Sequence, residues 1–576
     1  MNKRLISLLL CFLMLISVSA TGCSVFGNNS EETTGSSTVA DPDQGKAITL
    51  SWYIPCEKPV SAEDVALVEE AINKITKSKF KTQIKLHMPT LDEYYATIEG
   101  IMQARVDEEE QSQLAKDELK KALRLARAEG NTDTVAVISK FYEDHPEWVK
   151  YQETEASTDT EETVPETQLN ELGMPEIKYP EERENQLDII WLGGYDKFME
   201  YVNNDLLQRL DEQLSSTSKK LKQYIYPGAL DSVKTAGSGT YAIPNNTVIG
   251  EYTYLLLNKR LVDKYKYTPS DLTNIVKCAN FLADVKKYEP DVLPIVGEIP
   301  VTLTKYWSID PETLEINHNK FNIIGHGISD TATLGSMFNF TGVFGTNVEL
   351  ANTSDYAKQL IAIRTYKDLG YVTEYTNIAK EYAVRVVKGG GELAETYGED
   401  YYMNIIESPR ADYEDIFGSM FGVSTYTRSL KRSMEIITYL NTNSDLRNVL
   451  QYGVEDVHYE LDDEGMLHRL NNNYMMDINK TGNVFMAYPE EGMPKNVWTY
   501  GKAQNTAAKT MMTLGLRFKD EDFQSSSDPE AVNKLKAAIK AVNDYSADVE
   551  KRLNAAQSVA ELEEIMREVA RKFGTD

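Results

Sequence analysis

Cysteine is scarce in this 576-residue chain, which has only four, and beyond the first twenty residues it has no long apolar run. Four cysteines cannot form the disulfide framework of a small secreted domain. No later segment approaches the roughly 18–20 apolar residues that a membrane-spanning helix needs, which excludes a polytopic membrane protein. Glycine (33) and proline (19) show no period, which excludes collagen-like and low-complexity chains.

The charge and the aromatic content of the chain limit the classes of molecule that it can bind. The chain has 60 Lys and Arg against 89 Asp and Glu, a net charge of −29. Such a surface repels phosphate groups, so nucleic acid and anionic lipid headgroups are poor partners. Thirty-four tyrosines stand against sixteen phenylalanines. Tyrosine combines a flat apolar face with a hydroxyl group, which favours binding of polar ligands that have apolar ring faces.

The N-terminus indicates export. Lys3 and Arg4 precede an apolar stretch, residues 5–18, and small residues lead to Cys23. A short apolar run between basic and small residues is typical of a signal peptide. The ending resembles the bacterial lipoprotein box, with Ala20 in place of the usual Leu. This implies that residues 1–22 are removed and that Cys23 carries the lipid, including palmitate, which anchors the chain at the extracytoplasmic face of the cell membrane. The alternative is a plain secretory signal with an incidental cysteine.

Residues 23–46 then form a polar, flexible tether, since they contain almost nothing to bury. Cys11 leaves with the signal. Cys56 and Cys278 remain, either as buried thiols or as one bridge.

The body of the chain predicts an α/β fold. Residues 47–54 alternate like a strand, and residues 61–76 have helical spacing, with Ser61 as the N-cap. A second strand at 81–87 and a second helix at 90–103 follow. A strand–helix–strand–helix order implies a parallel sheet with right-handed crossovers. Further strands are expected at 186–192, around 241–244 and at 252–259.

An acidic insert at 106–185 interrupts this pattern. Residues 107–127 and 132–142 predict two helices, and the Glu- and Thr-rich residues 152–169 predict disorder. The insert is interpreted as a helical hairpin with a mobile loop; a docking element for a partner protein is the alternative.

Short motifs resemble, in order, those of bacterial family 1 extracellular solute-binding proteins. Tyr241-Ala-Ile-Pro244 is similar to a Tyr-Gly-Ile-Pro crossover, and Leu257–Leu261 to the Tyr-Asn-Lys-x-Leu strand that follows it. Residues 421–427 resemble a Gly-Ile-Ser-x-x-Ser segment. Residues 440–459 resemble the Leu-Leu-x-Tyr-Gly-Ile-Glu-Gly-x-His-Tyr block of an oligosaccharide-binding lipoprotein subgroup, with Asp456 in place of its Gly. The resemblance covers 48–105 and 186–515, without the insert.

This resemblance implies a type II periplasmic-binding-protein-like fold, in which two α/β lobes joined by a hinge close on a ligand in the cleft between them. It implies capture of a carbohydrate, an oligosaccharide, and delivery to the permease subunits of an ABC importer. The expected organisation is a signal peptide (1–22), a tether (23–46), the first part of lobe 1 (47–245), lobe 2 (246–410), a return segment with the hinge (411–515) and C-terminal helices packed on a lobe (516–576).

Catalysis and metal binding find little support in the sequence. The six histidines never pair at metal-ligand spacing, no Cys-x-x-Cys motif occurs, and no Gly-x-Ser-x-Gly elbow is present. Residues 462–465 lack the ligand spacing of a calcium loop and, between 459–461 and 466–470, predict a hairpin turn. We therefore expect a binding protein without a cofactor or metal. A non-transport sensory or adhesive lipoprotein and a secreted carbohydrate-active enzyme are the alternatives, and a peptide or polyamine remains an alternative ligand.

A sugar site needs aromatic faces and hydrogen-bonding side chains, which in an open parallel sheet gather at strand ends. The candidates at such positions are Tyr53 and Glu57 after the first strand, Trp191 and Tyr195 beside Gly193-Gly194, Asn245 and Asn246 after the crossover, Tyr306 and Trp307 in lobe 2, and Arg410 and Phe417 near the return between lobes.

Overall fold

The computed structural model describes residues 45–128, 132–144, 167–169, 175–235, 239–301, 306–312, 316–325, 349–350, 353–374, 380–509 and 529–573. The predicted signal peptide, nearly all of the tether and most of the segment 152–169 lie outside these residues. Cys56 and Cys278 are both buried free thiols, which decides between the two alternatives for this pair. Among the described helices, none has the length and apolar composition needed to cross a bilayer.

Five strands from distant parts of the chain form the first sheet. They are β1 (Ile48–Tyr53), β2 (Thr82–His87), β5 (Ile189–Leu192), β8 (Ala242–Pro244) and β18 (Met420–Val423). Their order is β2-β1-β5-β18-β8. β1, β2 and β5 run parallel, whereas β18 is antiparallel to both β5 and β8. The sheet is therefore completed only after the chain has built the second sheet and returned.

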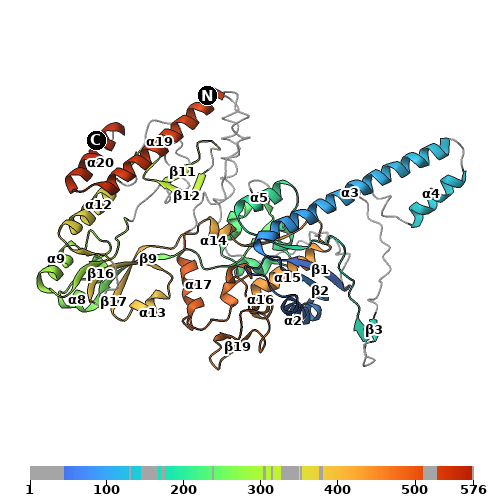
Figure 1. The fold of residues 1–576 in the computed structure, drawn as a ribbon, viewed down its shortest axis with the longest axis horizontal. Coiled ribbons are helices and arrows are strands. Elements are labelled where there is room, and N and C mark those ends of the chain that lie inside the picture. Colours follow the sequence, from blue (N-terminus) through green and yellow to red (C-terminus); the bar gives the residue numbers. More distant parts are fainter. Residues whose placement is uncertain are drawn as a thin grey trace, which may run out of the picture. The chain divides into compact units, whose positions relative to one another are not determined.

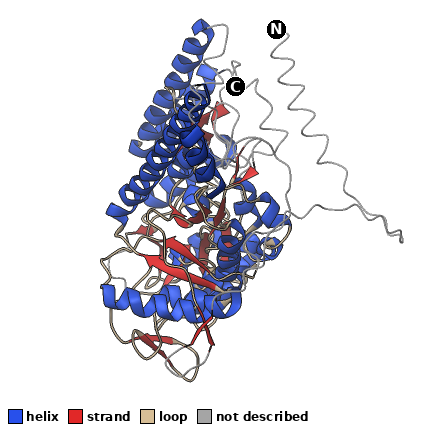
Figure 2. Ribbon diagram, turned by 90° about the vertical axis from the view of Figure 1, so that its right-hand side faces the viewer, coloured by secondary structure: helices blue, strands red, loops and turns tan. Residues whose placement is uncertain are grey.

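The second sheet consists of β9 (Tyr252–Asn258), β10 (Leu293–Val296), β15 (Val372–Thr373), β16 (Tyr382–Gly389) and β17 (Tyr401–Glu407). Their order is β15-β10-β16-β9-β17. β10 is parallel to β15 and β16, and β9 is antiparallel to β16 and β17. Two mixed sheets with helices around the strands (Figure 2) confirm the predicted α/β fold with two lobes.

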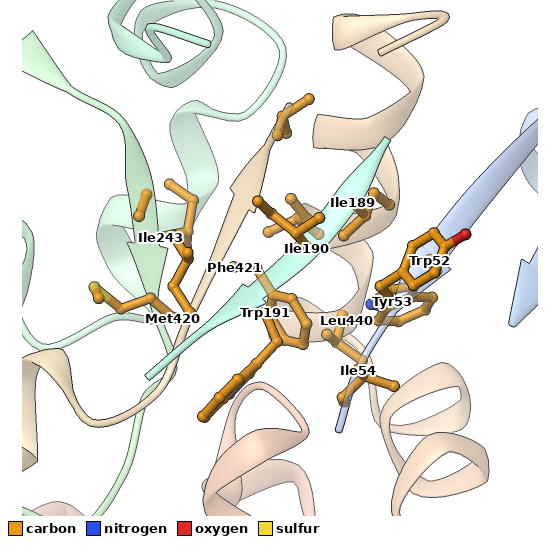
Figure 3. Packing of buried hydrophobic residues seen from close by; sticks show 14 of the residues in the cluster. Trp52, Tyr53, Ile54, Ile189, Ile190, Trp191, Ile243, Met420, Phe421 and Leu440 are labelled. Atoms are coloured by element: carbon orange, nitrogen blue, oxygen red, sulfur yellow. The ribbon is translucent and has the colours of Figure 1, made fainter. Parts of the chain in front are cut away.

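The core of the first lobe lies on both faces of its sheet. Every residue of β1 is buried, which is expected of a strand covered on both sides. Trp52 meets Phe421 edge to face with ring centroids 5.7 Å apart. Figure 3 shows Ile189, Ile190 and Trp191 along β5, with Met420 and Phe421 beside them.

Helices α2 (Ala62–Phe80), α5 (Tyr195–Asn203), α15 (Leu430–Thr442) and α16 (Ser444–Tyr452) contribute buried apolar side chains to this core. The predicted N-cap of α2 is confirmed, because the Ser61 hydroxyl accepts a hydrogen bond from the Asp64 N–H at 3.1 Å. Asp64 also reaches the 454–458 loop, as described below.

The helix after β2 is longer than predicted. Residues 90–103 and 107–127 were expected to form two helices, but they form one, α3 (Leu91–Ala128). No residue between them breaks the helix, and side-chain pairs bridge the junction: Gln103 bonds Asp107 at 2.8 Å and Arg105 pairs with Glu108 at 2.9 Å. In Figure 1, α3 extends to the short helix α4 (Thr132–Asp144), so the helical hairpin itself is confirmed.

Two crossings, at residues 245–251 and 408–419, carry the chain between the sheets. Helix α17 (Val497–Ala507) holds the first of them. The Gln504 amide donates to the Ile249 carbonyl at 3.1 Å, and the Asn505 side chain accepts from the Ile249 N–H at 2.8 Å. Gln504 is 1% exposed. The backbone of the crossing is therefore tied to a helix that follows both sheets in the chain.

The remaining elements are short or lie at the C-terminal end. The predicted hairpin at 459–470 is confirmed as β19 (Tyr459–Leu461) paired antiparallel with β20 (Leu467–Arg469). The C-terminal helices α19 (Pro529–Ala555) and α20 (Val559–Phe573) pack with α12 (Thr353–Asp368) and with a small strand group. The others are β3 (Thr167–Leu169), β4 (Pro175–Ile177), α6 (Asp211–Ser215), η2 (Lys219–Gln223), α7 (Pro227–Ser232), β6 (Lys234–Thr235), β7 (Gly239–Thr240), α8 (Lys259–Lys264), η3 (Pro269–Asp271), α9 (Ala279–Tyr288), β11 (Tyr306–Ile309), β12 (Ile316–Asn322), β13 (Ile324–Gly325), β14 (Glu349–Leu350), α13 (Leu393–Tyr397), α14 (Tyr413–Phe417), η4 (Ile478–Lys480) and η5 (Val484–Met486).

The motif at 440–459 forms the end of α15, all of α16 and the loop after it. Gly453 ends α16 with a φ of 85°, and a Cβ there would lie 2.6 Å from Nδ1 of His458. This nitrogen accepts from the Val454 N–H at 2.9 Å, so Nε2 carries the hydrogen and faces Asp64 Oδ1 at 3.2 Å. The motif therefore ties the end of α16 to the start of α2.

Replacing Gly453 by alanine should lower the free energy of unfolding by about 2–4 kcal/mol, because the side chain adds backbone strain and displaces His458 from both hydrogen bonds. Gly492→Ala is the matched control: its φ is 88°, but a Cβ there meets nothing within 4 Å. It should cost only the strain, about 1–2 kcal/mol. Urea denaturation measures both; equal losses would contradict the packing argument.

Candidate functional site

The carboxyl ends of the first sheet bring together four segments that are far apart in sequence. β1, β5 and β8 end at this edge, and antiparallel β18 begins there. Residues after β1, after β5 and after β8 therefore lie beside Ser419, which immediately precedes β18. In open α/β sheets this edge is where ligands bind.

A hydrogen-bond chain connects three of these segments. The indole Nε1 of Trp191 donates to the Ser419 hydroxyl oxygen at 2.7 Å, and the Asn245 amide donates to the same oxygen at 2.8 Å. The Asn245 amide also donates to the Asn479 carbonyl at 3.0 Å. Oδ1 of Asn245 is buried and has no hydrogen-bond partner among the described residues. The predicted residues Trp191 and Asn245 thus meet, with Ser419 between them.

A charged pair covers the indole. The Lys480 ammonium lies 5.1 Å from the centroid of the Trp191 ring and forms an ion pair with Glu57. Glu57 also accepts from the Asp477 N–H at 3.2 Å. Trp191 is only 4% exposed, because Lys480 covers one part of its ring and Gly193 another: a Cβ at 193 would lie 2.1 Å from the ring. Glu57 was predicted; Lys480 was not.

Two tyrosines of α3 fix the backbone around Trp191. The Tyr94 hydroxyl lies 2.8 Å from both the N and the O atoms of Trp191, and the Tyr95 hydroxyl lies 2.9 Å from both the N and the O atoms of Gly193. Burial raises the pKa of both phenols. The end of β5 is therefore held by side-chain bonds on both sides of its last residue.

An aromatic group follows the Gly193-Gly194 turn. The Tyr195 ring lies 4.8 Å from that of Phe417 and 5.4 Å from that of Tyr413. Phe417 is buried, whereas Tyr195 and Tyr413 are partly exposed. The structure therefore brings the predicted Tyr195 and Phe417 together, and it adds Tyr413, which the sequence reasoning missed although it stands four residues before Phe417 on α14.

Tyr53 and Asn246, which were also predicted, contact residues outside the hydrogen-bond chain at Trp191. The Tyr53 ring stacks on His87 with centroids 4.3 Å apart, and burial, helped by Glu182 and Asp188, raises its pKa to about 12. The Asn246 amide donates to the Tyr224 carbonyl at 2.6 Å and lies 3.2 Å from Asn483 Oδ1. Both side chains are buried; Tyr53 is held by ring stacking and Asn246 by hydrogen bonds within the first lobe.

The remaining predicted residues belong to other elements of the fold. Arg410 is in the second crossing, where its backbone forms an isolated bridge with Lys509 and its oxygen would lie 2.5 Å from a Cβ at Gly250. Tyr306 and Trp307 are in β11, which pairs with β12; their side chains lie outside the part that the structure describes.

A separate cavity of about 230 Å³ lies on the first lobe, between residues of α6, η2, α7, β6 and β7. The Asp211 and Asp231 carboxylates in its wall are already paired with Arg209 and Lys234, each at 2.7 Å. The lining comprises Asp211, Leu214, Lys222, Pro227, Leu230, Asp231, Lys234 and Thr240. None of them belongs to the hydrogen-bond chain at Trp191.

The edge offers aromatic rings, amides, a hydroxyl and a charged pair, which suit a neutral ligand rich in hydroxyl groups. Within the described residues, no group of three or more His, Cys, Asp or Glu side chains is placed to hold a metal ion. The sequence reasoning missed Ser419, Asn479 and Lys480 here. The only sequence signal for Asn479 and Lys480 is the polar composition of residues 477–483, and Ser419 has no comparable signal.

Comparison with known proteins identifies a relative with a related sequence. No family model matches the chain. Over 402 residues, 63% of this chain and 74% of the relative, it is 22% identical to a carbohydrate ABC transporter substrate-binding protein of Streptococcus pneumoniae serotype 4. The resemblance to extracellular solute-binding proteins that the motifs predict is thereby confirmed, and this relative is a substrate-binding protein.

Solved structures with similarity along the chain include the N-glycan transport solute binding protein (NgtS) of Streptococcus pneumoniae, at 15% identity and a TM-score of 0.44, covering 92% of this chain and 98% of that one. An extracellular solute-binding protein of Bifidobacterium longum subsp. infantis is 12% identical with a TM-score of 0.40, covering 93% and 96%.

Proposed function

We propose that this chain, which is similar to the substrate-binding protein of a carbohydrate ABC transporter, binds an oligosaccharide at the carboxyl edge of its first sheet. The observation that carries the proposal is the grouping of Tyr195 and Tyr413 beside the hydrogen-bond chain of Trp191, Ser419 and Asn245. Sugar rings present an apolar face to aromatic side chains and hydroxyl groups to amides and hydroxyls, so both halves of the grouping have a counterpart in the ligand.

The proposed roles differ from residue to residue. Tyr195 offers a partly exposed ring face, Asn245 offers its unpartnered Oδ1, and Glu57 offers a carboxylate that hydroxyl groups can reach. Trp191 becomes available to a sugar when the Lys480 side chain moves off its ring. Trp307, with Tyr306, is the proposed contribution of the second lobe.

Delivery to the permease subunits of an ABC importer completes the proposed function. Closure of two lobes would follow from contacts that the ligand makes only in the closed state, because a ligand shifts an equilibrium only by its differential affinity. The lipid on Cys23 would hold the protein at the extracytoplasmic face of the membrane, and residues 23–46 would let it reach the permease. The lipoprotein-box resemblance and the polar composition of that segment support this arrangement.

Ligand screening tests the assignment. The full chain is heated with manno-, malto- and xylo-oligosaccharides, with a mixed peptide library and with spermidine. A bound oligosaccharide should stabilise the native state by about 2.7 kcal/mol at one hundred times its dissociation constant and raise the unfolding midpoint accordingly. A shift with peptides or spermidine and none with any sugar would show that the carbohydrate assignment is wrong.

A further inference from the structure

Helix α16 buries polar side chains as well as the apolar Leu446 and Leu450 that it contributes to the core. Arg447, Asn448 and Gln451 are 0%, 2% and 1% exposed. Buried polar groups are costly unless they find hydrogen-bond partners. These three side chains therefore need hydrogen-bond partners inside the protein.

Their partners lie on one irregular segment, residues 474–488. An Arg447 guanidinium nitrogen donates to the Ile478 carbonyl at 3.3 Å, and the Asn448 amide donates to the Met486 carbonyl at 3.2 Å. Gln451 donates to the Met476 carbonyl at 2.5 Å and accepts from the Thr481 hydroxyl. Because this segment has only two short 3₁₀ turns of its own, η4 and η5, side chains of α16 supply bonds that regular structure would otherwise supply.

Arg447 differs from its two neighbours because it brings a charge. Within the described residues, no carboxylate lies within 4.0 Å of its guanidinium group, and its Nε has no partner. Its guanidinium carbon lies 5.7 Å from the centroid of the Tyr452 ring. The carboxylate that acts on it, Glu490, is held by Arg469 through two contacts of 3.1 Å. Burying an ion without a paired counter-ion opposes stability, so stability alone does not explain this residue.

The segment that Arg447 contacts also contributes residues to the candidate ligand site. Ile478 is followed by Asn479, whose carbonyl accepts from Asn245, and by Lys480, which covers Trp191 and pairs with Glu57. A shift of the Ile478 carbonyl would therefore move both neighbours relative to the sheet edge.

We propose that Arg447 is a positioning residue for the ligand site: its guanidinium, with the amide of Gln451, fixes the 476–481 turn and so sets where Asn479 and Lys480 stand against Trp191. This inference rests on the proposed function, since the site it positions is the proposed oligosaccharide site. The inference also assigns a role to the motif around 447–453, which supports the 476–481 turn.

The test compares Arg447→Met with Arg432→Met. Arg432 is a matched control, because it is also buried and donates to a carbonyl, that of Phe80, but at the opposite edge of the sheet, before β2 begins. Both variants should lose stability in urea denaturation. Calorimetric titration with the oligosaccharide found by screening should show at least tenfold weaker binding for Arg447→Met and less than a twofold change for Arg432→Met.

A double-mutant cycle excludes a general structural effect. In a Lys480→Met background, Arg447→Met should weaken binding clearly less than in the wild type, because the Lys480 ammonium that it would misplace is already absent. Gln451→Met, a milder change to the same turn, should weaken binding in the same direction if Arg447→Met does not fold. Equal affinity losses for the Arg447 and Arg432 variants, or full additivity with Lys480→Met, would overturn the inference. Absence of any carbohydrate binding by the wild type would instead remove the proposed function.

Discussion

Replacing Trp191 by alanine should weaken oligosaccharide binding at least tenfold, equivalent to about 1.4 kcal/mol. The change removes the ring at the centre of the site and the Nε1 donor to Ser419, and it leaves the Lys480 ammonium without the ring it covers. The measurement is calorimetric titration at a temperature at which the variant is folded, because losing a buried tryptophan also costs about 3–5 kcal/mol of stability. Trp191→Phe, which keeps a ring but not the donor, should show an intermediate affinity.

Trp52→Ala is the matched control for this prediction. Trp52 is fully buried on the neighbouring strand, in register with Ile189, and its ring packs on Phe421. It should destabilise the protein as much as Trp191→Ala while leaving the affinity within twofold. If both tryptophan variants lose stability and neither loses affinity, the site is not at this edge.

Replacing Asp188 by alanine should lower the free energy of unfolding by at least about 3 kcal/mol. Asp188 is fully buried and stands just before β5. One carboxylate oxygen accepts from the Ser51 N–H at 2.9 Å and the Gln186 amide at 2.6 Å; the other accepts from the Thr427 hydroxyl at 2.8 Å and the Arg428 N–H at 2.6 Å. Alanine would leave the two buried donors of Ser51 and Gln186 and the two partly buried donors of Thr427 and Arg428 without this acceptor. Each orphaned buried donor costs about 1–3 kcal/mol, although the costs are not additive.

Urea denaturation measures this loss, and Asp231→Ala provides the comparison. Asp231 forms an exposed ion pair with Lys234, and exposed pairs contribute about 0–1 kcal/mol. A loss below 1 kcal/mol for Asp188→Ala would show that the carboxylate is not the link between β1, β5 and the loop after β18. An unchanged affinity in a variant that still folds would show that this link serves stability alone.

Periodicity located the individual elements well. Alternation found β1 and β2, helical spacing found α2, and Ser61 marked its start. Such signals depend on residues two to four positions apart, which a sequence displays directly. The same locality explains a misjudged helix boundary: the charged residues after Gln103 suggested a new helix, but their side chains pair along a continuous α3.

The candidate site was predictable in part. Trp191 lies at the end of a strand that the sequence reveals, and Glu57 and Asn245 follow two others; parallel strands place their ends at one edge. Lys480 and Ser419 follow no such rule. Ser419 reaches the edge because β18 enters the sheet antiparallel, and Lys480 reaches it on a turn that side chains of α16 hold in place.

The sequence by itself determined where most of the described strands and helices form and that the fold is α/β, because these depend on local pattern and composition. Only the tertiary structure decided which strand ends share an edge, that Trp191 is covered by Lys480, and that Arg447 is buried with no ion pair to any described residue. Those facts depend on contacts between residues that can stand more than two hundred positions apart, as Trp191 and Ser419 do. Such contacts are set by packing of the whole core, which a single sequence does not display.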